Sequence, residues 1–102
     1  MPQNKILSML GLAARAGALK SGEFAVEQTV KSNKALLVIV AADASEGTKK
    51  HFHDMCSYRD IPIYEYATKD ELGRCIGKES RASIALTDEG IVKGLISRLQ
   101  EV

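Results

Sequence analysis

The sequence predicts an α/β fold in which helices cover both faces of a small sheet. Segments with apolar residues at helical spacing alternate along the chain with short segments rich in branched apolar residues. The clearest of the latter, residues 35–41, is apolar throughout, which is typical of a central strand buried on both faces. Such alternation predicts a layered sandwich. The 102 residues fit one domain, 1–102, and a 45% apolar share suffices for a core.

The part of the chain before this strand predicts two helices and a brief strand. Residues 5–15 have apolar side chains at helical spacing, and Gly17 follows them as a stop signal. Residues 18–20 have room for a short strand. Ser21 is the expected N-cap of a second helix, whose first turn carries the favourable negative charge of Glu23.

The part after residue 41 predicts three more helices and two more strands. Ser45 is the expected cap of a helix that runs to about Arg59, and its inward side chains are expected to be Phe52, Met55, Cys56 and, in part, Tyr58. Strands are expected at residues 63–66 and 82–86, a short helix at 70–76 after Thr68, and a final helix after Thr87 or Asp88.

Composition places limits on function. Fourteen basic and thirteen acidic side chains give a net charge of +1, so overall charge does not predict a nucleic-acid partner. Two cysteines without a dense pattern favour free thiols in a reducing compartment. The polar first residues and the lack of an apolar run near 20 residues argue against secretion and membrane insertion, so we expect a cytoplasmic protein.

Residue types capable of chemistry are present, but ordinary roles account for most of them. His51, His53 and Cys56 are too few for a zinc site, and we interpret them as surface histidines and a core cysteine. Neither Cys56 nor Cys75 has the features of an activated nucleophile. The carboxylates that follow strands, at positions 43, 88 and 89, are interpreted as helix caps or first-turn charges. We therefore expect no enzyme activity and no cofactor.

A cluster of cations follows the short helix at 70–76. Arg74, Lys78 and Arg81 lie within eight residues and are opposed only by Glu79. The cluster is either a solvated helix end whose cations complement the helix dipole or a phosphate-binding site beside a loop.

The ordered set of motifs resembles a known family, the kink-turn-binding ribosomal-protein superfamily that includes archaeal L7Ae and eukaryotic L30e proteins. Within that superfamily the chain most resembles the short bacterial YlxQ-type proteins. The resemblance spans nearly the whole chain, in the family's order, and rests on residues 11–13, 21–23, 34–38 with 42–45, 61–63, 72–73, 76–78, 81 and 87–90.

The resemblance implies a three-layer α/β/α sandwich with a four-stranded mixed sheet and an RNA-binding edge made by residues 20–28, 42–45 and 78–83. The resemblance also implies that bent RNA of the kink-turn type is recognised there by shape. The candidate RNA-binding residues are Lys20, Ser21, Gly22, Glu23, Phe24, Gln28, Asp43, Arg74, Lys78, Arg81, Ala82 and Ser83.

The helix that should read the bend departs from the family pattern. Kink-turn readers carry Asn or Lys, Glu or Gln, and Lys where this chain has Phe24, Ala25 and Gln28. Phe24 can stack on a base or pack in the core, and we expect it in the core. RNA contacts are then expected mainly from backbone and phosphate-binding groups.

These observations predict an RNA-binding ribosomal or ribosome-associated protein of translation. Its expected partner is structured RNA, ribosomal or regulatory, with the ribosome as a candidate and with no membrane and no small-molecule substrate. The alternative is a protein-interaction module that kept the fold and lost RNA recognition.

Overall fold

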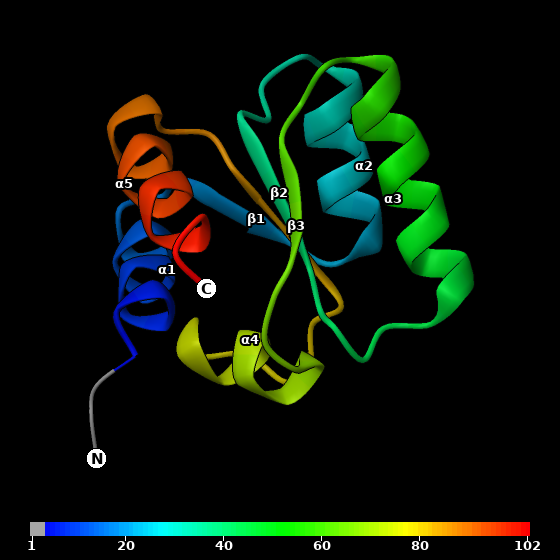
Figure 1. Ribbon diagram of the computed structural model, residues 1–102. Coiled ribbons are helices and arrows are strands. Elements are labelled where there is room, and N and C mark those ends of the chain that lie inside the picture. Colours follow the sequence, from blue (N-terminus) through cyan, green and yellow to red (C-terminus); the bar gives the residue numbers. More distant parts are fainter. Residues whose placement is uncertain (1–3) are drawn as a thin grey trace.

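The computed structural model describes residues 4–102 and shows five helices around a four-stranded sheet (Figure 1). The elements in chain order are α1 (Lys5–Arg15), β1 (Leu19–Ser21), α2 (Glu23–Lys31), β2 (Leu37–Val40), α3 (Glu46–Tyr58), β3 (Ile63–Glu65), α4 (Lys69–Cys75), β4 (Ser83–Leu86) and α5 (Glu89–Leu99). The predicted order of helices and strands is confirmed.

The sheet is mixed, as expected, with the strand order β1-β4-β2-β3. β4 is antiparallel to both β1 and β2, whereas β2 and β3 are parallel. All residues of the two central strands are buried. The predicted doubly buried strand is therefore confirmed, although hydrogen bonding limits it to Leu37–Val40.

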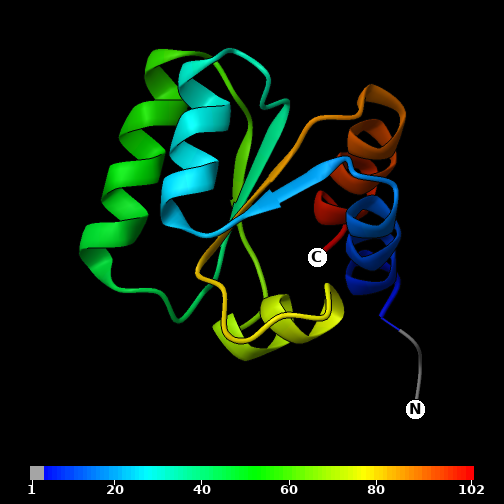
Figure 2. The same cartoon turned by 180° about the vertical axis from the view of Figure 1, so that it is seen from behind.

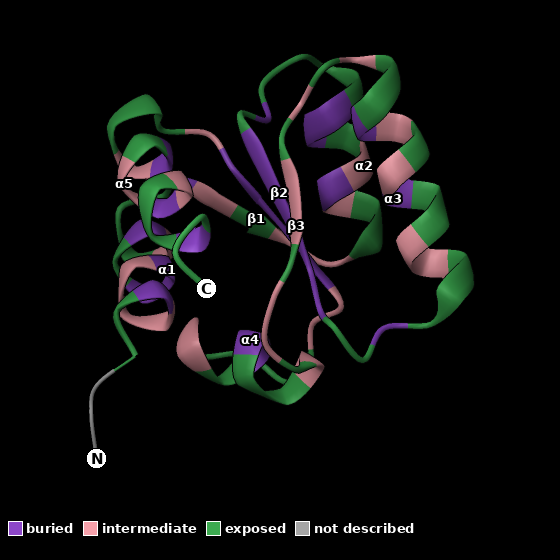
Figure 3. Cartoon of the chain, in the orientation of Figure 1, coloured by how far each residue is buried: buried purple, intermediate pink, exposed green. Residues whose placement is uncertain are grey.

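Helices cover both faces of the sheet and make the predicted three layers. α2 and α3 lie on one face, α1 and α5 lie on the other, and α4 lies at one end of the molecule beside α1 (Figures 1 and 2). Buried positions concentrate on the central strands and on the helix faces that pack against them (Figure 3). Among residues 4–102, no helix combines the length and the apolar character needed to cross a membrane.

Local capping signals in the sequence are mostly confirmed. Ser45 and Asp88 cap α3 and α5, and Thr68 forms a capping box with Glu71 at the start of α4. The prediction for Ser21 was wrong. Ser21 is the last residue of β1, and Gly22 occupies the N-cap of α2 without a side-chain hydrogen bond.

Two aromatic side chains expected inside the protein are exposed. α2 buries Val26, Thr29 and Val30, and Phe24 falls on the opposite face with 75% of its surface accessible. Near the end of α3, Tyr58 is 84% exposed and its ring lies against the guanidinium of Arg59. The expected core position of Phe24 was wrong, and so was the expectation that Tyr58 faces inward in part.

A tight turn at the end of α4 positions the segment that leads into β4. Lys78 N donates a hydrogen bond to Gly73 O at 2.8 Å. A Cβ atom on Gly73 would lie 1.7 Å from the backbone oxygen of Glu79, so no side chain fits there. This close approach fixes the path of residues 77–81 across the end of α4.

Both cysteines are free thiols and neither is activated. Cys56 is fully buried in α3, and this burial raises the pKa of its thiol to about 11, against a smaller lowering by Arg59. Burial also raises the pKa of the Cys75 thiol, which donates a hydrogen bond to Leu72 O. The expected core position of Cys56 is confirmed.

Replacing Gly73 with Ala is expected to destabilise the fold by at least about 1–3 kcal/mol, the usual cost of overpacking, because the new methyl group meets backbone that must move. Urea denaturation of both proteins measures the loss. Gly47→Ala is the matched control, because nothing lies within 4 Å of its Cβ position in α3 and Ala favours a helix. Equal stabilities of the Gly73→Ala protein and the native protein would contradict this account of the turn.

The buried thiols are expected to react in a fixed order with a maleimide at pH 8. A pKa of about 11 leaves only about 0.1% of Cys56 as thiolate at that pH, and its sulfur lies in the closed core, so it should react only after unfolding. Cys75, which is half-buried, should be labelled first. Mass spectrometry of the labelled peptides tests this order, and faster labelling of Cys56 in the native protein would contradict it.

Candidate functional site

Three segments that are distant in sequence meet where β1 and β2 end and β4 begins. Gly22 N donates a hydrogen bond to Ser83 O at 3.1 Å, and Ala41 N donates one to Ala82 O at 2.9 Å. We call this surface the loop edge and define it as residues 20–28, 42–45 and 78–83. These are the segments that the family resemblance predicted, and the structure brings them together (Figure 2).

Hydrogen bonds made by Arg81 and Asp43 connect the segments of the loop edge to one another and to α4. Arg81 Nε donates to Ser21 Oγ at 3.2 Å, and Arg81 N donates to Lys69 O at 3.0 Å. Lys69 N in turn donates to Asp43 Oδ1 at 2.8 Å. Asp43 therefore anchors the loop after β2 to the start of α4. Lys69 was not found from the sequence, because it makes these contacts through its backbone and residue type carries no signal for them.

The start of α2 differs from the other helix starts in the described chain. Side chains of Asn4, Ser45, Thr68 and Asp88 cap the other four helices. Gly22 caps α2 with φ 93° and ψ 150°, a backbone conformation that strongly favours glycine. The N–H groups of residues 23–25 have no hydrogen-bond partner within residues 4–102, and such groups bind phosphate at helix N-termini.

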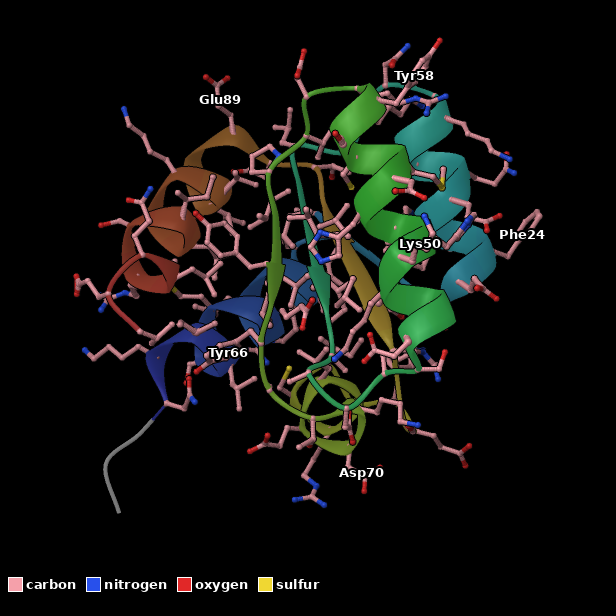
Figure 4. The ribbon with its side chains drawn as sticks, turned by 45° about the vertical axis from the view of Figure 1, so that its right-hand side comes forward. Phe24, Lys50, Tyr58, Tyr66, Asp70 and Glu89 are labelled. Atoms are coloured by element: carbon pink, nitrogen blue, oxygen red, sulfur yellow. The ribbon has the colours of Figure 1, made fainter. Side chains whose placement is uncertain are left out.

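Phe24 and Gln28 lie on the exposed face of α2. The phenyl ring of Phe24 projects away from the protein at the first turn of the helix (Figure 4). Gln28 is also exposed and lies one turn further along the same face. An aromatic ring and an amide are thus presented beside the uncapped helix start.

The side chains of two predicted site residues contribute little accessible surface. The Ser83 side chain is fully buried, and its hydroxyl has no hydrogen-bond partner among the described residues. Ala82 is half-buried. They contribute to the loop edge through their backbone carbonyls, which accept hydrogen bonds from Ala41 N and Gly22 N.

In the described part of the chain, the cations at and beside the loop edge have no acidic partners. Within residues 4–102, none of the cations predicted as site residues, namely Lys20, Arg74, Lys78 and Arg81, forms an ion pair. All the ion pairs in that range involve side chains of α3. Unpaired cations beside free N–H groups make the edge suitable for anionic ligands. Four acidic residues also belong to the edge, namely Glu23, Glu27, Asp43 and Glu79.

The histidines of α3 take part in structural contacts away from the loop-edge cations. His51 pairs with Glu27 of α2, and His53 Nε2 lies 3.1 Å from Glu65 Oε2 in β3. The hydrogen bond from His53 lowers the pKa of the Glu65 carboxyl, with help from Lys49. No three His, Cys, Asp or Glu side chains gather as candidate metal ligands in the part of the chain that the structure describes.

Comparisons with known proteins agree with this architecture. The chain is 42% identical over 91 residues to the RNA-binding protein YlxQ of Bacillus subtilis, covering 89% of this chain and 91% of that protein. A solved structure of a Bacillus halodurans protein of unknown function superposes with a TM-score of 0.92 at 39% identity, covering 96% of this chain and 99% of that one. The 15.5kD RNA binding protein of Giardia lamblia shares the fold, with a TM-score of 0.80 at 20% identity over 99% of this chain and 92% of that one.

The model of one protein family matches residues 4–95, which include every element from α1 to β4 and the whole loop edge. By this match and by its identity to the Bacillus subtilis relative, the chain belongs to the Ribosomal protein L7Ae/L30e/S12e/Gadd45 family.

Proposed function

We propose that this chain binds structured RNA, bent in the manner of a kink-turn, at the loop edge. The observation that carries the proposal is the meeting of an uncapped helix start with unpaired cations on one surface. Membership of a ribosomal-protein family and the name of the Bacillus subtilis relative support RNA as the ligand. We place this activity in the cytoplasm, on ribosomal or regulatory RNA, as binding and not catalysis.

Backbone and phosphate contacts supply most of the proposed affinity. The free N–H groups at the start of α2 suit phosphate oxygens, and Lys20, Lys78 and Arg81 add charge-assisted contacts. Nothing lies within 4 Å of the Cβ position of Gly22, so an RNA strand can approach the backbone there. These contacts read the shape of the RNA and not its base sequence.

Phe24 has a different part in the proposal, that of a stacking platform. Its ring can accept an unstacked base on its face, which Asn or Glu at the start of α2 could not do in the same way. The neighbouring Ala25 has no group that could bond to a base edge. Stacking therefore compensates for the missing hydrogen-bonding side chains.

Binding is expected to favour a kink-turn RNA over an unbent duplex of the same length, measured by titration across salt concentrations. Removing two phosphate-binding cations in the Lys20→Gln/Lys78→Gln protein should make the negative slope of log K against log[salt] shallower by about 1.4–1.8, at about 0.7–0.9 per contact. Lys34→Gln/Lys93→Gln removes the same charge outside the loop edge, at exposed side chains without ion pairs, and should change little.

Absence of binding to either RNA at low salt would overturn the proposal. The departures from the family pattern at Phe24 and Ala25 and the net charge of +1 would then favour the interaction-module alternative. Capture of partners from a lysate with and without nuclease separates the two, because protein partners survive nuclease and RNA-tethered ones do not.

Phe24→Ala is expected to weaken RNA binding by about 1–3 kcal/mol, roughly 5- to 150-fold, because one base loses its stacking partner. The ring is exposed, so the thermal stability of the free protein should stay nearly unchanged. Phe24→Trp should keep the affinity. Tyr58→Ala is the matched control, since it removes an equally exposed ring near the end of α3, away from the loop edge (Figure 4). Equal loss in both Ala variants would argue against stacking at Phe24.

A further inference from the structure

A groove leads away from the loop edge between α1, β1 and the end of α4. Its volume is about 610 Å³, and it opens into a second hollow of about 480 Å³ that shares the residues Gly11, Arg15 and Cys75. We call the two hollows together the α1–α4 groove. Ser21 and Lys78 belong both to its lining and to the loop edge, so the two surfaces are continuous.

Close packing of two helices forms the floor of the groove. A Cβ atom on Gly11 of α1 would lie 2.8 Å from the backbone oxygen of Cys75 in α4. The guanidinium of Arg15 lies over this contact, with Nη1 3.7 Å from the same Cβ position. The groove therefore has a rigid floor with a cation held above it.

Positive charge lines the α1–α4 groove without any acidic residue. Arg15, Arg74 and Lys78 line it, and none of them pairs with a carboxylate in the described chain. Arg15 and Arg74 also complement the dipoles at the ends of α1 and α4. That role requires no hollow between them. A concave surface lined by one sign of charge concentrates counter-ions, which here are anions.

The remaining lining suits a nucleotide chain better than a small anion. Leu12, Leu19 and Ile76 add apolar surface beside the cations, and sugars and bases can cover such surface. Arg15, Arg74 and Lys78 all line the larger hollow, and Arg15 also lines the smaller one that continues from it. Successive phosphates along a strand would meet them in turn.

We propose that the α1–α4 groove binds the sugar-phosphate backbone of the RNA strand that continues past the loop edge. The inference rests on the proposed function and extends the RNA footprint from Ser21 to Arg15. It assigns a ligand-binding role to Arg15, which no sequence motif indicated, and places the predicted RNA-binding residue Arg74 on this second surface, outside the loop edge.

The test is the salt dependence of RNA binding by the Arg15→Gln/Arg74→Gln protein, combined with hydroxyl-radical footprinting of the RNA. We expect the negative slope of log K against log[salt] to become shallower by about 1.4–1.8, and the affinity near 0.15 M salt to fall on the order of tenfold. Protection of the RNA should disappear on one flank of the footprint only. The charge-keeping Arg15→Lys/Arg74→Lys protein should retain most of the slope, and Lys34→Gln/Lys93→Gln should behave as the native protein.

The outcomes separate this inference from the proposed function. A native slope and footprint in Arg15→Gln/Arg74→Gln, together with a loss in Lys20→Gln/Lys78→Gln, would overturn the groove and leave the loop edge standing. Failure of the native protein to bind RNA would overturn the proposed function itself. Thermal unfolding of each variant shows whether it is folded, and loss of slope in the folded charge-keeping variant would contradict phosphate binding in the groove.

Discussion

The antiparallel insertion of β4 between β1 and β2 is the constraint on which the rest of the structure depends. Because β4 runs against both neighbours, its first residues pair with the last residues of each, Ile84 with Ser21 and Ser83 with Val40. The segments that follow β1 and β2 thus emerge beside the segment that precedes β4. β1 has no other partner in the sheet, so this pairing places the turn at Gly22 beside the rest of the loop edge, where Arg81 Nε bonds to Ser21 Oγ.

Local interactions explain which parts of the fold could be predicted from the sequence. The caps Ser45, Thr68 and Asp88 bond to backbone N–H groups three residues away, so sequence spacing alone reveals them. The continuous run of apolar residues at β2 likewise predicts that this strand is buried on both faces. The mixed sheet and the position of the three site segments came from resemblance to a family, because strand pairing is not encoded in any short stretch.

Tertiary contacts explain the predictions that failed. Ser21 matches the residue type of a cap, but its hydroxyl accepts a hydrogen bond from Arg81, 60 residues away. Phe24 is apolar, yet Val26 and Val30 define the buried stripe of α2 and Phe24 lies two residues from it, on the far side of the helix. The prediction of a core position relied on the apolar residue type of Phe24, whereas the helical spacing of the buried residues places it on the exposed face. The sequence did not indicate a site at Arg15, because the groove that it lines forms only when α4 packs against α1 at Gly11.

The late position of β4 in the chain has a consequence for synthesis. Chains emerge N-terminus first, and β4 (Ser83–Leu86) is the last of the four strands along the chain. Until that strand is available, β1 has no hydrogen-bonding partner in the sheet and the turn at Gly22 has no neighbour. Ser21 and Ile84 are far apart in sequence, and closing that loop costs entropy before the pairing forms, so we expect this step late in folding. A nascent chain that lacks β4 therefore carries Lys20 and Phe24 without the neighbouring segments that complete the loop edge.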